Sequence, residues 1–466
     1  MEQSSPPVQV PTLDPGQRAG RLRVSRLSRS AVLLAAAGRG AARTALAALW
    51  PGKGRASRRD QAMLRTADDV ARTMGNMKGV SMKVGQIMSL MGGALPEGVA
   101  DRLAGLQAAA PPMSPELVRE VFIQDFGRPP ERLFRRFEER PFAAASIGQV
   151  HRAQLPDRTE VAVKVQYPGV KEAIAADLAN LGTVFGLAAV AARGFDPGPV
   201  VEDLRRGISA ELDYELEAAR QQRFQHIFEG HPFVRIPRVY PELGSRRVLV
   251  QEFITGRPFI SARERPAVER NRIAEIIFRF TFGCMHRHGL FQADPHAGNY
   301  LLLDDGKVAF LDFGCIAEFA PSLLAQINSV VHGVIVGDFE QWRRGMEAIG
   351  YVPPGVELTT DQLWEQMRVY YSFILKDGVT FTPELSAAMV RQNLTLTGDV
   401  GRVNRLLNIP AGVIFIQRIT FGFTGLMASI QPSGPWRSIT EEYVLGRGPS
   451  TELGRLSALH SPGTWV

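Results

Sequence analysis

Cysteine is scarce in this 466-residue sequence, which contains only Cys284 and Cys315. Two cysteines cannot form a disulfide framework or a cysteine-rich zinc site, and their scarcity favours a reducing compartment. Apolar residues make up 45% and charged residues 22% of the chain, which excludes a largely disordered protein. The length predicts two or three domains.

Long hydrophobic runs without charge are also missing. Residues 31–50 are interrupted by Arg39 and Arg43, and residues 409–430 by Arg418. A membrane-spanning helix needs about 20 apolar residues, and a central arginine is costly there. We therefore expect no integral span, and we predict for 409–430 an amphipathic helix that is either buried or faces a membrane. The apolar run near residue 31 is too short and too far along the chain for a signal peptide.

Positive charge is concentrated at the N-terminus. Residues 1–60 hold eleven Lys and Arg against three Asp and Glu, so this tail carries +8 and the other 406 residues −1. Trp50 is the only aromatic residue in the tail, which disfavours base stacking and nucleic acid as a partner. An anionic membrane surface is the favoured partner. An interfacial helix over 31–50 and an unstructured basic tail both fit this composition.

Hydrophobic spacing and turn residues predict a strand-rich lobe followed by a helical lobe. A Ser114-Pro115 start and an acid in the first turn predict a helix that ends near Phe126. Two hydrophobic runs separated by Asp304-Asp305-Gly306 predict a hairpin. The predicted helices are 61–92, 99–110, 114–126 and 200–228, and most of the chain beyond 265. The predicted strands are 146–154, 160–166, 236–240, 246–253, 300–303 and 307–311.

Two short motifs in the second half contain the residue types that phosphoryl transfer requires. Asp294 and Asn299 lie five residues apart in a loop, and Asp312 begins an Asp-Phe-Gly sequence at a strand end. Carboxylate and amide oxygens bind Mg²⁺, and an Asp orients the attacking hydroxyl or water in kinase-like sites. Asp-Phe-Gly alone is a weak signal. Its place beyond a hairpin, shortly after the Asp–Asn loop, makes the combination specific.

A phosphate-binding half is predicted upstream. Lys164 ends a Val-Ala-Val-Lys strand of the kind whose lysine reaches the α- and β-phosphates. The small residues before it lie in the position of a nucleotide-covering loop. They are Ala143, Ala144, Ala145 and Ser146, with Gly148 beyond them. Taken singly, a solvated edge lysine and an ordinary alanine-rich turn are the alternatives.

The predicted helix 200–228 offers acidic partners for Lys164. They are Glu211, Asp213, Glu215 and Glu217. Helical neighbours are three or four residues apart, so these four cannot share one face. We expect one to pair with Lys164 and at least one to face water. The ordered set of alanine-rich loop, lysine strand, acidic helix, Asp–Asn loop and Asp-Phe-Gly predicts a kinase-like nucleotide fold.

These residues closely resemble the UbiB-type atypical kinases, also called aarF-domain-containing kinases. The resemblance rests on Lys83-Val-Gly-Gln86 in the first helix and on the segments 143–146, 211–217, 291–299 and 311–314. It covers about residues 61–430. A Lys-x-Gly-Gln helix ahead of the small lobe is not found in ordinary protein kinases, so this signal is specific.

The resemblance implies an α+β, protein-kinase-like two-lobed fold with a helical N-terminal extension that covers the active site. It implies ATP and Mg²⁺ as cofactors. The implied catalytic residues are Asp294, Lys164, Glu217, Lys83 and Gln86, with Lys164 paired to Glu217 and Asp294 in the catalytic-loop role. The implied cofactor-binding residues are Ala143, Ala144, Ala145, Ser146, Lys164, Glu211, Asp213 and Glu252, the last in a hinge at 251–254 whose backbone would bind adenine. The implied Mg²⁺ ligands are Asn299 and Asp312.

The family is linked to ATP hydrolysis and to support of ubiquinone or related isoprenoid-lipid metabolism at membranes. Its helical cover occupies the place where a protein substrate would dock, which disfavours protein phosphorylation. The sequence departs from typical protein kinases in having Gln292-Ala293 where His-Arg usually precedes the catalytic Asp. It also lacks an Ala-Pro-Glu sequence after Asp312. His286 and His288 end a helix without cysteine partners, so we interpret them as structural, C-terminal capping groups.

Five segments are expected. They are a basic tail (1–60), a helical extension (61–115), a kinase-like N-lobe (116–255), a helical C-lobe (256–440) and a C-terminal tail (441–466). The favoured function is an atypical kinase-like ATPase of unknown acceptor, with a lipid or an isoprenoid or quinone precursor as partner. The alternative is a nucleotide-gated lipid-binding or scaffold protein without significant turnover. We expect a cytoplasmic location, with peripheral association at the inner face of the membrane as the open alternative.

Overall fold

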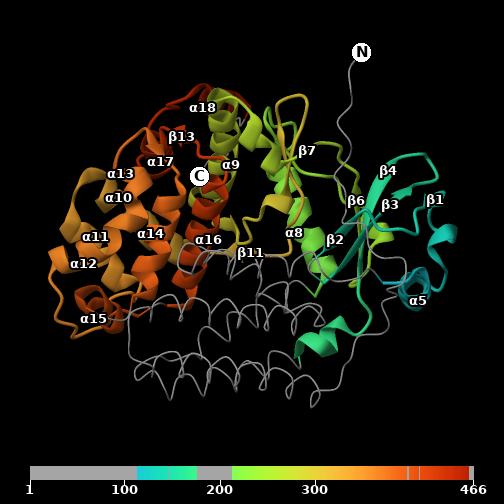
Figure 1. Ribbon diagram of the computed structural model, residues 1–466, viewed down its shortest axis with the longest axis horizontal. Coiled ribbons are helices and arrows are strands. Elements are labelled where there is room, and N and C mark those ends of the chain that lie inside the picture. Colours follow the sequence, from blue (N-terminus) through green and yellow to red (C-terminus); the bar gives the residue numbers. More distant parts are fainter. Residues whose placement is uncertain (1–112, 146, 176–211, 396–397, 409, 461–466) are drawn as a thin grey trace, which may run out of the picture. The chain divides into compact units, whose positions relative to one another are not determined.

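The computed structural model describes residues 113–145, 147–175, 212–395, 398–408 and 410–460 (Figure 1). The chain divides into two compact units. Unit 1 consists of Met1–Ala218 and Arg238–Phe253, and unit 2 consists of Ala219–Pro237 and Ile254–Val466. The basic tail and the predicted helices 61–92 and 99–110 lie outside the described residues.

A five-stranded antiparallel sheet forms the body of unit 1. Its strand order is β1-β3-β4-β6, and β2 also pairs with β3. The strands are β1 (Arg136–Phe137), β2 (Ala143–Ala145), β3 (Gly148–Gln154), β4 (Glu160–Gln166) and β6 (Val248–Glu252). The predicted strand 160–166 is confirmed residue for residue, and β6 lies inside the predicted strand 246–253.

Strand β4 is buried along almost its whole length. Val161, Val163 and Val165 have no exposed surface and belong to the core of unit 1. Because successive side chains of a strand point to opposite faces, Lys164 lies on the other face, where it is 7% exposed. The alternative interpretation of Lys164 as a solvated edge residue is therefore excluded.

Helix α5 (Pro115–Phe126) has the predicted bounds and packs on the unit 1 core. Pro115 occupies the first helical position, where its missing N–H costs nothing. Gly127 ends the helix at φ 68°, and its N–H donates to the Ile123 carbonyl at 3.0 Å. A left-handed residue at this position favours glycine. Phe122, which has no exposed surface, contacts Phe134 edge to face.

Helix α8 (Tyr214–Ile227) is shorter than the predicted helix 200–228, whose first part lies outside the described residues. The chain is not helical at Leu212 and Asp213, so the prediction is wrong there. The Asp213 carboxylate accepts a hydrogen bond from the Leu216 N–H at 3.2 Å. An aspartate that binds the N–H groups of a first turn starts a helix instead of continuing one.

Unit 2 contains three small sheets. The first has the order β5-β10-β9-β7, the second pairs β8 with β11, and the third pairs β12 with β13. The predicted hairpin is confirmed as β9 and β10, but the predicted strand 236–240 is wrong. The strand β5 ends before Pro237, which lacks the N–H that a sheet ladder needs. The strands are β5 (Val234–Arg235), β7 (Arg257–Pro258), β8 (Leu290–Gln292), β9 (Tyr300–Leu302), β10 (Val308–Phe310), β11 (Ile316–Glu318), β12 (Val379–Thr380) and β13 (Ser433–Gly434).

Helices make up most of unit 2, as predicted (Figure 1). They are α9 (Ala267–His288), α10 (Pro321–Val336), α11 (Phe339–Ala348), α12 (Thr360–Met367), α13 (Ser372–Leu375), α14 (Pro383–Leu394), α15 (Gly398–Leu406), α16 (Ala411–Ala428), α17 (Trp436–Val444) and α18 (Glu452–His460). Short 3₁₀ turns are η3 (Pro130–Arg132) and η4 (Pro241–Leu243) in unit 1, and η5 (Phe259–Glu264), η6 (Ala297–Asn299) and η7 (Arg368–Tyr371) in unit 2. Among the described helices, none combines the length and the apolar character needed to cross a bilayer.

The C-terminal end of α9 shows that the interpretation of His286 as a capping group is wrong. Gly289, at φ 64°, caps this helix and donates its N–H to the Met285 carbonyl. His286 is instead buried and donates its Nδ1–H to Asn328 Oδ1 at 2.6 Å. Burial lowers the pKa of His286 to about 4, so the ring is neutral at pH 7 and is not a cationic cap. Both cysteines are buried free thiols.

Candidate functional site

The residues predicted to bind phosphate lie in unit 1, around a buried ion pair. Lys164 Nζ donates to Glu217 Oε1 at 2.6 Å, and the two residues are only 7% and 3% exposed. The pair joins the end of β4 to the first turn of α8. A buried ion pair is retained only when both charges are well satisfied, because removal from water costs several kcal/mol per ion. Lys164 is thereby held in a single position on its strand.

The structure distinguishes among the candidate acidic partners. Glu217 is buried, whereas Glu215 is exposed and faces water. Asp213 caps α8 and accepts a second hydrogen bond from Arg246 Nη2 at 2.8 Å. Glu211 lies outside the described residues, as do Lys83, Gln86 and Ser146. The question left open by helical spacing is therefore answered for Lys164, whose partner is Glu217.

The alanine-rich segment is a strand and not an open loop, which corrects the prediction. Residues Ala143–Ala145 form β2 and pair with residues 148–150 of β3. Gly148, at the start of β3, allows a very close approach of the next strand. A Cβ atom there would lie 2.2 Å from the Val165 carbonyl oxygen, so no side chain fits without a shift. Glycine at position 148 therefore permits the close pairing of β3 with β4.

The hinge prediction at 251–254 also needs correction in detail. The N–H of Glu252 donates to the Arg238 carbonyl at 2.7 Å, and the N–H of Phe253 donates to the Glu160 carbonyl at 3.1 Å. Both donors are thus used inside unit 1. An adenine ring at this segment would have to meet carbonyl groups or a later N–H.

The residues predicted to bind a metal ion lie in unit 2, in the loop that follows β8 and just after β10. The Asp294 carbonyl accepts hydrogen bonds from the His296 N–H at 2.8 Å and from Asn299 Nδ2 at 2.9 Å. The N–H of Leu311 donates to the Asn299 carbonyl at 3.0 Å. These bonds fix the loop against the end of β10. With its amide nitrogen used, Asn299 has Oδ1 left as the oxygen that suits a hard cation.

Asp312 follows β10 and accepts hydrogen bonds from Gly314 and Gln292. Its carboxylate accepts the Gly314 N–H at 3.0 Å, and its carbonyl accepts Gln292 Nε2 at 2.7 Å. Phe313 is fully buried, with its ring centroid 5.0 Å from that of Phe224 in α8. Arg220 Nη1 donates to the Gly314 carbonyl at 2.8 Å. The backbone of the Asp-Phe-Gly sequence is therefore fixed on both sides of the aromatic ring.

Sequence reasoning missed two residues that organise this half. Gln292 was noted only as a departure from His-Arg, yet its buried amide joins β8 to Asp312. Tyr300 is fully buried at the start of β9. Burial, with the nearby carboxylates of Asp294 and Asp312, raises the pKa of Tyr300, so its hydroxyl stays protonated. The shared influence on Tyr300 shows that both carboxylates lie near one side chain.

The oxygen donors suit magnesium better than a transition metal. Within the described part of the chain, no group of three or more His, Cys, Asp and Glu side chains is placed to hold a metal ion. Mg²⁺ commonly uses one or two protein ligands and completes its shell with water and phosphate oxygens. Asn299 and Asp312 fit that requirement, and they do not fit a zinc site.

Comparison with known proteins gives one family. The ABC1 atypical kinase-like domain matches residues 105–345. Atypical kinase COQ8B, mitochondrial, of Danio rerio is 31% identical over 274 residues, which are 58% of this chain and 44% of the relative. Atypical kinase coq-8, mitochondrial, of Caenorhabditis elegans is 28% identical over 394 residues, 82% of this chain and 51% of the relative. The chain thus spans about half the length of these curated relatives.

A solved structure, the complex of Rv3197 and erythromycin from Mycobacterium tuberculosis, aligns with a TM-score of 0.60 at 29% identity. The alignment covers 82% of this chain and 96% of that one. The two-lobed, kinase-like α+β fold expected from the sequence is confirmed. Because the domain match covers more than half of the residues, the chain belongs to the ABC1 atypical kinase-like family, which is the UbiB or aarF-domain-containing kinase family.

Proposed function

We propose that this protein binds Mg-ATP and cleaves its γ-phosphate, either by hydrolysis or by transfer to a small acceptor. The observation that carries the proposal is the buried Lys164–Glu217 pair, at 2.6 Å. A lysine fixed by a glutamate in this way is the arrangement that positions the α- and β-phosphates in kinase-like sites. A purely structural pair in such a place is expensive compared with apolar residues of similar volume.

The remaining roles follow from chemistry. Asn299 Oδ1 and the Asp312 carboxylate would hold Mg²⁺, which neutralises charge on the phosphate oxygens when it is bound. Asp294 would orient the attacking water or hydroxyl and take its proton. Lys83, Gln86 and Glu211 are proposed to cover the site with Asp213.

The biological setting is proposed from the family. Its members named above include atypical kinases of mitochondria, and the family is related to ubiquinone biosynthesis. We assign this chain a role in ubiquinone or related isoprenoid-lipid metabolism at a membrane, with the basic segment 1–60 as the membrane-binding part. The proposed lobes are 116–255 and 256–440, with 61–115 as the covering extension and 441–466 as the C-terminal tail.

The test is phosphate release from Mg-ATP by the purified full chain, with and without anionic liposomes. Asp312→Asn removes one proposed Mg²⁺ ligand, and we expect it to lower release by at least about a hundredfold. Asp305→Asn is the matched control, because Asp305 lies in the exposed β9–β10 turn, where its carboxylate interacts with the N–H and the ammonium group of Lys307. Equal turnover in both variants would contradict the metal role.

A second candidate function is a nucleotide-switched binding protein without turnover. The observation that favours it is the paired strand β2, since a hairpin of alanines closes less freely over phosphates than a glycine-rich loop. In that case Mg-ATP would raise the unfolding temperature and change liposome binding while no phosphate is released.

A further inference from the structure

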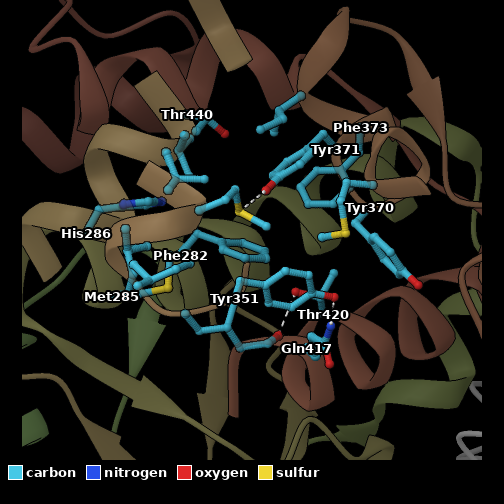
Figure 2. Close-up of a pocket in the computed structure, with 18 of the residues that line it drawn as sticks. Phe282, Met285, His286, Tyr351, Tyr370, Tyr371, Phe373, Gln417, Thr420 and Thr440 are labelled. Carbon is cyan, nitrogen blue, oxygen red and sulfur yellow. Dashed lines mark hydrogen bonds between the residues drawn. The ribbon is translucent and has the colours of Figure 1, made fainter. Parts of the chain in front are cut away.

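A cavity of about 130 Å³ lies inside unit 2, among α9, α10, α16 and the turn from η7 to α13. Figure 2 shows Phe282 and Met285 of α9 on one side and Tyr351, Tyr371 and Thr420 on others, all around one common space. Protein interiors contain few voids larger than a water molecule, so a space of this size is unusual. Asp294, Asn299 and Asp312 do not line it, which separates it from the proposed phosphoryl-transfer residues.

The tyrosine hydroxyls in the wall already have partners. The Tyr351 hydroxyl accepts Gln417 Nε2 at 3.0 Å, and the Tyr371 hydroxyl accepts Trp342 Nε1 at 3.2 Å. The Tyr370 hydroxyl donates to the Met389 carbonyl at 3.3 Å. These bonds run within the wall and do not require a ligand.

The other polar groups of the wall behave in the same way. Thr420 Oγ1 donates to the Ile416 carbonyl at 2.8 Å, and Thr440 Oγ1 donates to the Trp436 carbonyl at 2.7 Å. His286 is neutral and donates to Asn328. A trapped water molecule needs two to four polar partners, so this wall holds water poorly.

The chemistry of the wall therefore selects an apolar occupant. Its carbon surface comes from phenylalanine, tyrosine, isoleucine, valine and methionine side chains. An engineered cavity of about 150 Å³ with a comparable aliphatic and aromatic lining stays dry and binds benzene. An empty cavity forfeits the dispersion contacts that a hydrocarbon would restore. We infer that this cavity is a binding site for an uncharged hydrocarbon group, from the size of benzene to a short branched alkyl segment.

The deep end of the cavity lies at α9, where Phe278 has no exposed surface. Half-buried residues of α10, α16 and η7 form another part of the wall, among them Val331, Gln417, Thr420 and Tyr370. A hydrocarbon can arrive either as a free small molecule or as the end of a chain that carries a polar headgroup. In both cases the group inside the cavity is a hydrocarbon. The two sources differ only in whether a polar headgroup remains outside the cavity.

Fluorobenzene is a suitable probe, because ¹⁹F NMR reports its binding to the full chain directly. Val331→Phe places a larger side chain on the cavity wall in α10. Val336→Phe is the matched control, because it is the same substitution on the same helix at a residue that is 51% exposed. Thr420→Leu fills the cavity from α16 and serves if Val331→Phe does not fold. We expect saturable binding by the parent chain and by Val336→Phe, and at least about tenfold weaker binding by either filled variant.

Octyl glucoside below its micelle-forming concentration, with glucose alone as its control, distinguishes the two sources. Displacement of fluorobenzene by octyl glucoside and not by glucose shows that the cavity accepts the end of a headgroup-bearing chain. No displacement, with fluorobenzene still bound, shows a closed site for free small hydrocarbons. Lack of saturable fluorobenzene binding, or equal binding by the parent chain and both filled variants, overturns the hydrocarbon site. The fluorobenzene and octyl glucoside experiments do not measure phosphate release. A negative result for the hydrocarbon site therefore leaves the proposed function untouched, and the reverse also holds.

Discussion

The side-chain amide of Gln292 donates a 2.7 Å hydrogen bond to the backbone carbonyl of Asp312. Gln292 is 3% exposed and ends β8, two residues before Asp294. One buried amide therefore connects the strand that leads to the proposed base, Asp294, with the proposed magnesium ligand Asp312. In most protein kinases the residues ahead of the catalytic Asp are His-Arg, so this chain solves the same positioning problem with a neutral side chain.

Gln292→Leu should disturb this connection and leave the half-buried Asp312 carbonyl without that donor. We expect the rate of phosphate release at saturating Mg-ATP to fall about tenfold or more, with a stability loss of about 1 to 3 kcal/mol. Tyr300→Phe is the matched comparison. The Tyr300 hydroxyl reaches Gln292 Oε1 only at 3.5 Å, so its removal should leave the amide in place.

The measurement is kcat and KM for phosphate release beside urea unfolding of each variant. A structural role alone would lower stability while the remaining folded protein keeps its kcat. Parent-like kcat in Gln292→Leu would thus exclude a positioning role.

The Lys164–Glu217 pair should respond differently to single and double substitution. Lys164→Met leaves Glu217 buried without its cation, and we expect a loss of about 3 to 5 kcal/mol in the free energy of unfolding. Lys164→Met combined with Glu217→Leu removes both charges and should recover much of that loss. Neither variant should release phosphate. Urea unfolding measures the first effect, and additive losses in the double variant would show that the two side chains are not coupled.

Much of unit 1 could be predicted because local rules and tertiary packing agree there. Strand β4 alternates valine with smaller or polar residues, and α5 has a proline at its first turn and a glycine after its last. The exact position of β5 could not be predicted. Its pairing with β10 depends on residues more than 70 positions away, and two-residue strands have no periodicity to detect.

The residue types of the candidate site were predictable, and its partners were so only in part. Helical spacing allowed any of four acids to meet Lys164, and the family resemblance implied Glu217, which is confirmed. The role of Asp213 as the cap of α8 followed from neither. Gln292 gave no sequence signal beyond its place before Asp294, because a buried amide acts through a backbone carbonyl that no motif records. The sequence gives no signal for the apolar cavity either, since its wall comes from helices that are far apart in sequence.

His151 should remain neutral in mildly acidic solution. Burial lowers its pKa to about 4, although the hydrogen bond to the Glu138 carbonyl works in the opposite direction. The geometry adds a reason. Gln149 Oε1 accepts the Met113 N–H at 2.8 Å, which orients the amide so that Gln149 Nε2 donates to His151 Nε2 at 2.9 Å. If His151 Nε2 were protonated, its N–H would face the N–H of Gln149 Nε2, and neither donor would have an acceptor in the other.

The same direction holds for His231, where burial and the charges of His460 and Lys307 lower the pKa to about 3. The unfolded chain takes up protons on these histidines near pH 6.5, and the folded chain does so only near pH 3 to 4. Above pH 6.5 both states are neutral and the histidines do not affect stability, and between pH 6.5 and about 4 they lower stability progressively as the pH falls. Each adds a slope of up to about 1.4 kcal/mol per pH unit. Urea unfolding at several pH values measures the slope, and an NMR titration of His151 with a midpoint near 6.5 would contradict it.

Glu442 should make the helical unit sensitive to stronger acid. Burial opposes its ionisation, but the hydrogen bonds and charge of Arg279, with hydrogen bonds from Ser450, hold the pKa of Glu442 below its usual value of 4.5. Arg279 Nη1 and Nη2 bind the two carboxylate oxygens at 2.8 and 2.9 Å, and both residues are buried. A lowered carboxyl pKa stabilises the fold above pH 4.5, and this contribution is lost as the pH falls through the lower folded value.

Glu442→Gln should therefore cost stability at pH 7 and less at pH 3, because the unfolded chain protonates Glu442 below about pH 4.5 and the advantage of the folded carboxylate then declines. Because one partner of a buried pair is removed, we expect a loss at pH 7 of about 3 kcal/mol or more. Glu452→Gln, in the first turn of α18, is the control for a glutamate outside this pair. Urea unfolding at pH 7 and pH 3 provides the comparison. Equal losses of stability at pH 7 and pH 3 would show that the negative charge of Glu442 does not contribute to its pairing with Arg279.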